Sequence, residues 1–443
     1  MKKNQTEYSG WGNYPRLMAE TLEPESIEAL QEVVRKAEVV IPRGLGRSYG
    51  DSALSVLLLS LKRMNYPQKF DEKTGILTTG GGTSFKTILE MIIPLGWFLP
   101  VTPGTKHITL GGAIAADVHG KNHHKDGSFG DYVVSMNIMM AGGDIVTCSK
   151  TEKTELFHAS IGGMGLLGII VSATVQMRPI ETSFISQKIV RTKNFEETMN
   201  TLQNAKDTTY SITWIDSAAR GKKMGRGVVF LGDHAPAALI PRGISVLPVS
   251  RKKSWPIFFS LPRFALNMLS VKILNKFIYF LHPSKESLVS YDSFFYPLDQ
   301  FSNWNRIYGS SGFLEYQCVV PKQGGDQVIR RIIEETVSSG LPAHLMGFKI
   351  FGKANDNLLS FPMEGYTLGI DFSIRKDLTT LFKVFDDIVI RSGGRLYLAK
   401  DTRMSKEIFD TSYRRAEEFK KYKRQVDPTN KFRSLQSMRL GLY

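Results

Sequence analysis

The sequence predicts an α+β protein with two main domains, and three observations lead to this prediction. The chain of 443 residues is longer than one ordinary domain. Its first 180 residues mix helical and strand patterns joined by short, glycine-punctuated connections, whereas residues 181–394 are much richer in aromatic side chains. With 42% hydrophobic and 22% charged residues, the chain has the composition of a globular protein.

The elements of the first 180 residues follow from the spacing of apolar residues and from turn residues between them. Helical spacing followed by a β-branched run predicts a helix and then a strand. Ser84 is placed to cap a helix, and Gly142-Gly143 is placed to join two strands. In order, we expect a helix and strand within 24–41, a glycine-rich turn at 42–52, a strand at 75–81, a helix at 84–96, a small-residue segment at 107–120, two strands within 131–149, a helix at 151–163 and a strand at 166–180.

Strand patterns at 312–321 and 344–352 alternate with helices in the aromatic-rich part of the chain. A further strand within 393–403 and a long polar helix within 406–432 complete the chain. The expected division is therefore 1–180, 181–394 and 395–443.

The net charge of +15 indicates attraction to polyanions: nucleic acid, anionic lipid or phosphorylated substrates. The alternative is a solvated basic surface without a specific partner. No arginine-rich block or zinc-finger spacing accompanies the charge, so we expect no nucleic-acid partner. The two cysteines, Cys148 and Cys318, lie far apart and form no CxxC pair, which is typical of a chain that does not depend on disulfides.

The N-terminal stretch MKKNQTEYSGWGNYPR has no apolar region behind its basic start, so no signal peptide is expected. Residues 250–283 are basic and then densely apolar, but Arg263, Lys272 and Lys276 interrupt any membrane-spanning run. Two short helical pieces fit this segment better than one amphipathic helix. These pieces would form either an interfacial membrane contact or a lid over a lipid substrate. The alternative is a buried helix pair in the second domain. We expect a cytoplasmic protein or one peripheral at the inner membrane, and the sequence does not decide which face.

Two glycine clusters raise the question of nucleotide binding. The cluster at 44–50 is one residue too long for GxGxxG; the cluster at 163–168 has that spacing but follows a helix and precedes a strand. A dinucleotide fingerprint needs the opposite order, so a nicotinamide cofactor is not expected. The turn at 42–52 is either a phosphate cradle or a simple turn. Small residues at 103–105 and 109–115 provide a second flat surface and suggest one extended cofactor.

The order of the motifs IPRGLGRSYGDS, PGT, TLGGAIAADVHGKNHH, GGMGLLGIIV and DPTNKF resembles the vanillyl-alcohol-oxidase superfamily of FAD-linked oxidases. Together with FYPLD, WNRIYG and AKDTR, they resemble its branch that oxidises decaprenylphosphoryl riboses, the flavin subunits of a 2′-epimerase. The likeness covers nearly the whole chain. It implies an FAD-binding fold made from both chain ends, with an antiparallel-sheet substrate domain inserted between them.

The resemblance also implies which residues contact the flavin. Arg47 stands where many members carry the histidine of RGxGH that tethers FAD, and no cysteine lies near His119, so a non-covalent flavin is expected. The implied contacts are Pro42, Arg43, Gly44, Leu45, Gly46, Arg47, Ser48, Tyr49, Gly50, Asp51, Ser52, Gly104, Thr109, Leu110, Gly111, Gly112, Ala116, Asp117, Val118, His119, Ile170 and Tyr397.

Three of the chain's eight histidines, His119, His123 and His124, lie within six residues. Adjacent side chains in a turn rarely converge on one ion, and no carboxylate cluster is evident, so no metal site is expected. The resemblance instead implies that His119 lies beside the flavin, while His123 and His124 shape the loop. Local packing of all three is the alternative.

For catalysis, the resemblance points to Lys400 as the group that holds the substrate hydroxyl or stabilises developing charge, with His119 and Tyr49 as positioning groups. A surface lysine is the alternative for Lys400. The implied substrate-binding residues are Trp214, Gln317, Lys349, Phe351 and Lys400, although structural roles are open for Gln317 and Lys349. The general base is left unassigned.

The chain also departs from this branch. Gly369 stands where mycobacterial members carry a cysteine next to the flavin, and Glu315, Thr367 and the order Phe295-Tyr296 differ as well. These differences leave the prenyl length and the sugar open.

The expected activity is FAD-dependent oxidation of the 2′-hydroxyl of a polyprenylphosphoryl-β-D-ribose to the 2′-keto compound. An NADH-dependent short-chain reductase would then complete epimerisation to the arabinose donor for cell-wall polysaccharide. Two alternatives remain at this stage: a soluble sugar-alcohol or aldonolactone oxidase of the same superfamily, and a flavin-free protein that binds nucleic acid through its basic surface.

Overall fold

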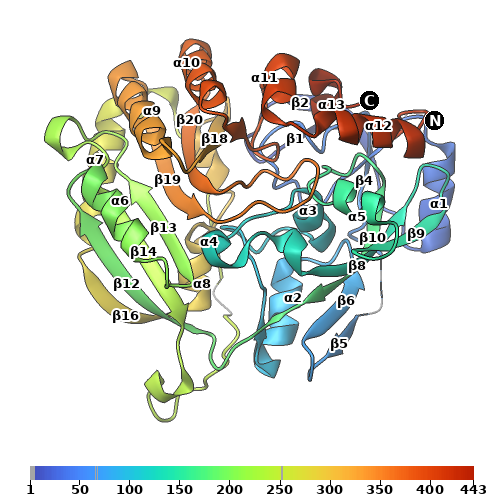
Figure 1. The fold of residues 1–443 in the computed structure, drawn as a ribbon, viewed down its shortest axis with the longest axis horizontal. Helices are drawn as coiled ribbons and strands as arrows, with labels where there is room; N and C mark the ends of the chain where they lie inside the picture. The colour runs from blue at the N-terminus through green and yellow to red at the C-terminus, as the bar shows by residue number, and fades with distance from the viewer. Residues whose placement is uncertain (1–4, 65, 67, 251–252) are drawn as a thin grey trace.

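A computed structural model describes residues 5–64, 66, 68–250 and 253–443, and the described chain is organised around three larger sheets (Figure 1). Two of these sheets come from the first 180 residues, and the third comes from residues 184–396. Both described chain ends lie on the side of the molecule away from the third sheet (Figure 1).

The first sheet has the order β1-β2-β4-β3, with a parallel core around β4. Its strands are β1 (Thr6–Ser9), β2 (Arg16–Leu22), β3 (Ile41–Pro42) and β4 (Leu57–Leu59), and helix α1 (Ile27–Lys36) joins β2 to β3. Ser26 caps α1 by accepting a hydrogen bond from the Ala29 amide at 3.2 Å. The predicted strand after α1 is shorter than expected, because Val40 forms only an isolated bridge with Phe432.

The second sheet is antiparallel, in the order β5-β6-β10-β8-β9. Its strands are β5 (Lys69–Asp71), β6 (Ile76–Gly80), β8 (Val133–Met139), β9 (Ile145–Ser149) and β10 (Ile169–Gln176); β7 (Trp97–Phe98) pairs separately with β11 (Arg178–Pro179). The helices of this region are α2 (Phe85–Ile92), η1 (Ile93–Leu95), α3 (Leu110–Ala115), α4 (His123–Asp126), η2 (Phe129–Tyr132) and α5 (Thr154–Ser160). The predicted cap of α2 is confirmed, since the Ser84 hydroxyl accepts from the Thr87 amide at 3.1 Å.

The third sheet has eight antiparallel strands in the order β16-β12-β14-β13-β19-β20-β18-β21. The strands are β12 (Phe184–Thr192), β13 (Tyr210–Ile215), β14 (Gly227–His234), β16 (Lys285–Ser290), β18 (Phe313–Pro321), β19 (Ala343–Phe351), β20 (Gly365–Ser373) and β21 (Arg395–Leu396). Helices α6 (Phe195–Asn204), α9 (Gly325–Ser339) and α10 (Leu378–Arg391) pack on one face of this sheet (Figure 1).

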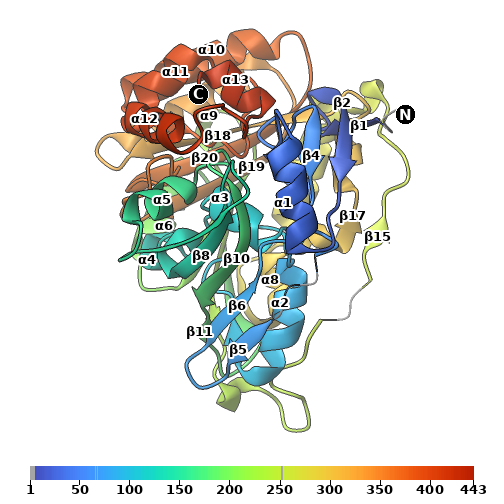
Figure 2. The same cartoon turned by 90° about the vertical axis from the view of Figure 1, so that its right-hand side faces the viewer.

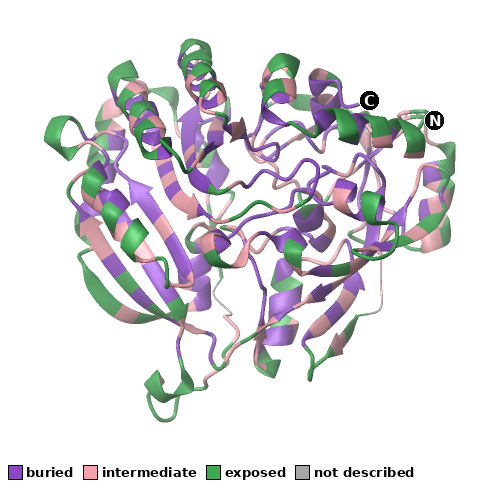
Figure 3. Ribbon diagram, viewed as in Figure 1, coloured by how far each residue is buried: buried purple, intermediate pink, exposed green. Residues whose placement is uncertain are grey.

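Side-chain alternation along β18 separates the two faces of this sheet. Tyr316 points to the helices, where its ring centroid lies 5.0 Å from that of Phe385 in α10. Glu315 and Gln317 point the other way, toward the first two sheets. Figure 3 shows the strands largely buried and the outer faces of the covering helices exposed. The second face of the sheet therefore supplies one wall of an internal site.

Between β14 and β18 the chain forms short elements and one longer helix, α7 (Met268–Leu281). The short elements are η3 (Gly221–Lys223), η4 (Ala237–Leu239), β15 (Trp255–Pro256), η5 (Arg263–Ala265), α8 (Tyr291–Phe295), η6 (Pro297–Gln300), β17 (Phe301–Ser302) and η7 (Trp304–Tyr308). The expectation of two helical pieces in 250–283 agrees with η5 and α7, although residues 251 and 252 lie outside the described residues.

The last fifty residues return to the first sheet and pass along one edge of the molecule (Figure 2). The predicted long helix within 406–432 is wrong: the chain forms α11 (Lys406–Ser412) and α12 (Ala416–Val426), and α13 (Leu435–Leu440) follows. The chain turns at Tyr413, whose buried ring stacks on Phe409 at 5.0 Å and whose hydroxyl donates to the Leu396 carbonyl at 2.7 Å. These tertiary contacts explain the break.

Candidate active site

A large cavity lies between the three sheets and has a volume of about 1230 Å³. It is larger than the ~300–1,000 Å³ typical of small-molecule sites. Its walls come from the turn at 42–53, the segment 103–121, residues 164–170, the inner face of the third sheet and residues 397–400. The space can therefore hold an extended ligand together with a second molecule.

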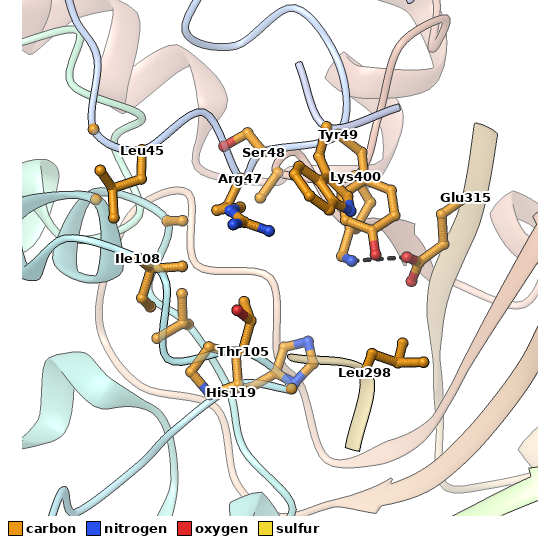
Figure 4. A pocket seen from close by; sticks show the side chains of 18 of the residues that line it. Leu45, Arg47, Ser48, Tyr49, Thr105, Ile108, His119, Leu298, Glu315 and Lys400 are labelled. Carbon is orange, nitrogen blue, oxygen red and sulfur yellow. Dashed lines mark hydrogen bonds and ion pairs between the residues drawn. The ribbon is translucent and has the colours of Figure 1, made fainter. Parts of the chain in front are cut away.

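The turn that follows β3 is held in shape by Arg43. The guanidinium donates to the Ser9 carbonyl at 2.7 Å and to the Ala53 carbonyl at 3.0 Å, so it ties the turn to β1. Gly46 has φ +65°, a conformation that favours glycine. Arg47 stacks its guanidinium 3.8 Å from the ring centroid of Trp11 and borders the open space (Figure 4). Arg47 is thus the cation that this turn presents to a ligand.

The residues around the turn fit a flat cofactor with a phosphate group. A Cβ at Gly44 would lie 2.5 Å from the Thr109 hydroxyl, whereas one at Gly104 would meet nothing within 4 Å. The backbone at Gly44 is therefore closely packed against Thr109, whereas the backbone at Gly104 borders empty space. The buried Ser52 hydroxyl lines the cavity and has no hydrogen-bond partner among the described residues. An unpaired buried hydroxyl of this kind is an open position for a ligand atom.

Helix α3 and the residues after it form the opposite side of the cavity. Thr109 caps α3 by accepting from the Gly112 amide at 3.2 Å. The hydroxyl of Tyr397 donates to the Ala116 carbonyl at 3.0 Å, and its ring stacks on Phe361 at 4.6 Å. The Tyr397 ring lies 5.2 Å from that of His119, so the two rings form a rigid aromatic corner of the cavity.

His119 is buried at this corner between two nitrogen groups. Its Nδ1 lies 3.0 Å from Lys349 Nζ, and its Nε2 lies 3.2 Å from Gln317 Nε2. Burial, followed by the charge of Lys349, holds the pKa of His119 well below its usual value, so the ring is neutral. A neutral imidazole has one N–H, so one partner must accept: the neutral amine of Lys349 or the oxygen of a rotated Gln317 amide.

Lys349 itself is enclosed by the cavity wall. Burial lowers its pKa to about 7; the Glu315 carboxylate opposes this shift and the Lys400 ammonium adds to it. Lys121 is similar, because burial and then the charge of Lys349 lower its pKa to about 7. Its amine donates to the Phe294 carbonyl. Two buried amines that titrate near neutrality thus line the same space.

Lys400 lies across the cavity from His119, close to Tyr49 and Glu315 (Figure 4). Its Nζ is 3.3 Å from the Tyr49 ring centroid and 2.7 Å from Glu315 Oε2. Asp371, the cross-strand neighbour of Glu315, accepts a hydrogen bond from the Tyr308 hydroxyl at 2.7 Å. Burial, followed by the charge of Glu315, raises the pKa of Asp371 well above its usual value. This end of the cavity therefore combines one ammonium with two neighbouring carboxyl groups.

The other end of the cavity is apolar and reaches helix α7. It is lined there by Ile189, Ile212, Phe230, Ile278, Leu281 and Leu345. The indole N–H of Trp214 and the hydroxyl of Thr213 are buried in this region without a partner among the described residues. One continuous space thus joins the charged corner to an apolar region.

Most of the predicted site residues line this cavity, and five do not. Gly50 packs against the Asp401 carbonyl, Leu110 is fully buried, and Phe351 lies behind His119 at 4.8 Å between ring centroids. Asp51 pairs with Arg439 at 2.8 Å. Asp117 accepts hydrogen bonds from Ser128, the Gly130 amide, Asn355 and Ser360. These five support the walls from behind.

Sequence reasoning gave no site role to Lys121, Glu315 or Asp371. Lys121 stands in the motif HGKNHH, and Glu315 was noted only as a departure from relatives. Asp371 lies two positions after Gly369 on the same strand, which places it on the same face of the sheet. This alternation along the strand was the sequence signal that could have predicted Asp371 as a cavity residue.

His123 and His124 take part in the loop. His123 Nδ1 accepts from the Gly352 amide at 3.2 Å, and His124 Nε2 lies 2.9 Å from the Thr208 carbonyl. The described residues contain no group of three or more His, Cys, Asp or Glu side chains that could hold a metal ion. Cys148 and Cys318 are both buried and unpaired.

Comparison with known proteins shows the family of the chain. Residues 19–149 match the FAD binding domain family, which implies an FAD-binding fold of the vanillyl-alcohol-oxidase type. A decaprenylphosphoryl-beta-D-ribose oxidase from Mycolicibacterium smegmatis is 35% identical over 98% of this chain and 97% of its own length. An uncharacterised Streptomyces coelicolor protein from the mprA 5′ region is 30% identical over 80% of this chain and 99% of its own. A putative D-arabinono-1,4-lactone oxidase from Neurospora crassa is 29% identical over 42% of this chain and 34% of its own. The chain belongs to the family of FAD-linked oxidases that contains decaprenylphosphoryl-beta-D-ribose oxidase.

Proposed function

We propose that this enzyme oxidises the 2′-hydroxyl of a polyprenylphosphoryl-β-D-ribose to the 2′-keto compound. The observation that supports this most directly is the single cavity, which joins a corner with Lys400, His119 and Glu315 to an apolar region beside α7. A polyprenylphosphoryl sugar also joins a polar, charged end, the sugar and its phosphate, to a long apolar prenyl chain. The substrate and the cavity therefore match from one end to the other. The full-length likeness to a decaprenylphosphoryl-beta-D-ribose oxidase supports the same assignment.

The cofactor is FAD. The turn at 42–49 with Ser52 would hold its pyrophosphate, with Arg47 as the nearby cation. Gly104, Thr109, Gly111, Gly112, Ala116, Val118 and His119 would line the flavin, with Ile170 toward the adenine and Tyr397 against the ring system. Gly50, Asp51, Leu110 and Asp117 would act from behind these contacts.

The bound flavin would supply a two-electron acceptor for the hydride of the substrate carbon. The chain's own groups would position the alcohol: Lys400 would donate a hydrogen bond to the substrate hydroxyl, and Tyr49 holds the Lys400 ammonium against its ring face. His119 would fix the aromatic corner on the other side. Lys349, Gln317 and Trp214 would meet the sugar and phosphate, with Phe351 supporting His119.

We further propose that the flavin is bound without a covalent link. Arg47 occupies the position of the tethering histidine in the motif RGxGH, and both ring nitrogens of His119 face protein groups. Precipitation with acid is therefore expected to release the yellow chromophore into the supernatant. Colour that stays with the precipitated protein would contradict this.

A peripheral membrane contact through α7 would bring the enzyme to its lipid substrate. The helix packs through Asn275, which donates to Asp216 at 2.9 Å, and Tyr279, which donates to the Thr192 carbonyl at 3.1 Å. Several of its apolar side chains face outward: Leu269, Ile273 and Phe277 are 67%, 63% and 63% exposed. Exposed apolar patches of this kind mark interaction sites, and the neighbouring Lys272 and Lys276 suit an anionic lipid surface. No helix among the described residues is long and apolar enough to cross a membrane.

The domain roles follow from this proposal. The first two sheets and the C-terminal return would hold FAD, while residues 181–394 would form the substrate domain inserted between them. The 2′-keto product must then be reduced from the opposite face to give the arabinose configuration, and an NADH-dependent short-chain reductase would supply that step.

An anaerobic titration tests the proposed reaction. The purified flavoprotein is mixed with a polyprenylphosphoryl ribose, and the flavin absorbance is followed; free ribose, sugar alcohols and aldonolactones are the comparison substrates. We expect the lipid-linked sugar to bleach the flavin and the free compounds to leave it oxidised. Bleaching by an aldonolactone or a polyol alone would instead identify a soluble oxidase of the same superfamily.

A further inference from the structure

Glu315 places a carboxylate in the cavity at the point where Lys400 also reaches it. Its side chain is 12% exposed, and Oε2 accepts from Lys400 Nζ at 2.7 Å. The Tyr49 hydroxyl also forms a hydrogen bond with this carboxylate. Glu315 therefore lies beside the group to which we assign the substrate hydroxyl.

Gly369 makes the room that this carboxylate occupies. Gly369 lies on β20, and a Cβ at this position would lie 2.8 Å from Glu315 Oε1, closer than side-chain atoms normally approach. Gly347, its direct partner across β19 and β20, is different, because a Cβ there would meet nothing within 4 Å. The space at position 369 is therefore limited by the Glu315 carboxylate, whereas the neighbouring position 347 has room for a side chain.

The proton between Glu315 and Asp371 belongs to Asp371. The two residues face each other across β18 and β20, and two carboxyl groups in contact do not both ionise. Asp371 is fully enclosed, and its pKa is raised well above the usual value by burial and then by the charge of Glu315. Of the two carboxyl groups, Glu315 is the one that forms the ion pair with Lys400, at 2.7 Å.

The neighbouring groups are less suited to receive a proton from the substrate. An ion-paired Lys400 is an ammonium, which has no lone pair. Both ring nitrogens of His119 face Lys349 and Gln317. A carboxylate has about four lone-pair positions, so Glu315 can hold Lys400 and Tyr49 and still accept another hydrogen.

We propose that Glu315 is the catalytic proton acceptor for the substrate hydroxyl, and that Gly369 leaves the space in which its carboxylate lies. This inference rests on the proposed oxidation. The O–H bond breaks and its proton forms a carboxylic acid on Glu315. The C–H bond breaks and its hydrogen leaves with the electron pair to the oxidised flavin, and a C=O bond forms. The alcohol loses two electrons, which the flavin gains.

The titratable and charged groups around Glu315 come from several elements. They are Tyr49 in the turn after β3, Tyr308 in η7, Lys349 in β19, Asp371 in β20, and Tyr397 and Lys400 after β21. The proton acceptor is therefore enclosed by groups from the FAD-binding part of the chain and from the third sheet.

The first test measures the rate of flavin reduction by a polyprenylphosphoryl ribose for the unaltered enzyme and Glu315→Gln. The amide keeps the shape but cannot take the proton, so we expect a loss of about 100-fold or more in rate and a small change in KM. Glu364→Gln, which removes an exposed partner of Lys322, is the control and should leave the rate unchanged. A rate for Glu315→Gln within a few-fold of the unaltered enzyme would overturn the inference. Failure of the unaltered enzyme to react would overturn the proposed oxidation as well.

The second test does not involve the flavin reaction. Melting temperatures are compared for Gly369→Ala and for the same change in a Glu315→Ala background, with Gly347→Ala as the control. The new methyl group would displace the end of the Glu315 side chain from Lys400, so Gly369→Ala should lower the melting temperature more than the same change does when Glu315 is absent. Gly347→Ala should have little effect in either background. An equal loss with and without Glu315 would contradict the role of Gly369.

Discussion

At the scale of single residues, the site is defined by amines in unusual surroundings. Lys349 and Lys121 both have a pKa of about 7, chiefly because burial disfavours their charged form. Such amines are kept in a cavity at a cost in stability. An anionic substrate that restores their charge would offset that cost.

Replacing Lys349 should therefore stabilise the protein in a pH-dependent way. Its pKa is about 7 in the folded protein and 10.5 in the unfolded chain. Between pH 7 and 10.5 the amine loses its proton on folding. The buried amine therefore lowers the free energy of unfolding by the largest amount below pH 7, and this destabilisation disappears as the pH rises toward 10.5. We expect Lys349→Met to raise the free energy of unfolding by about 4 kcal/mol at pH 7 and by much less at pH 10, since one pKa unit corresponds to about 1.4 kcal/mol.

Denaturant unfolding at several pH values measures this, with the exposed Lys353→Met as the control. A gain that is constant with pH would show that Lys349 is not a buried, discharged amine.

The positions of site residues were predictable from the sequence where a motif carries them. Arg47, His119, Lys349 and Lys400 lie in the cavity as the motifs indicated. Asp51 shows the opposite case: it was grouped with the flavin contacts because it belongs to the turn, yet it faces Arg439, nearly four hundred residues away in the chain. A linear pattern contains no information about such a partner.

At the scale of elements, α7 has the reverse of the usual amphipathic arrangement. A surface helix normally buries its apolar stripe, but α7 buries Asn275 and Tyr279 beside Val271 and exposes Leu269, Ile273 and Phe277. The sequence pattern correctly indicated two helical pieces; which side of α7 faces outward follows from hydrogen bonds to Asp216 and Thr192, which the pattern does not contain.

We expect Ile273→Ser combined with Phe277→Ser to weaken binding to vesicles of anionic lipid without lowering the melting temperature. Each side chain would contribute about 1.5–3 kcal/mol when buried in lipid, so the partition coefficient should fall at least about tenfold per residue. Co-sedimentation with vesicles measures it, and Met438→Ser, on the exposed side of α13, is the matched control. Unchanged binding of the double variant would exclude α7 as the contact.

Helix α12 shows how the C-terminal return is anchored. Lys423 is fully buried, pairs with Asp427 at 3.0 Å and donates to the carbonyls of Leu166 and Phe432, both at 2.9 Å. Lys423→Met would leave the Asp427 carboxylate buried without its cation, and should cost about 3–5 kcal/mol in urea unfolding. Lys421→Met, an exposed change on the same helix, should be neutral. A loss below about 1 kcal/mol would mean that this pair does not hold the return in place.

At the scale of the whole molecule, the cavity exists because distant parts of the chain meet. The turn after β3, helix α3, the inner face of the third sheet and Lys400 belong to segments that only the tertiary fold brings together. Local patterns predicted β8, β9, β18, β19 and the cap of α2. They missed α3 and the break at Tyr413, which depend on packing against other segments.

The measurement that tests the central claim most directly uses a polyprenylphosphoryl ribose carrying deuterium at C2′. The enzyme is incubated with this substrate and an electron acceptor, and the lipid product is analysed by mass spectrometry. Oxidation at C2′ predicts a keto product that has lost the deuterium, formed more slowly than from the unlabelled substrate. A product that keeps the deuterium, or no product at all, would contradict the assignment.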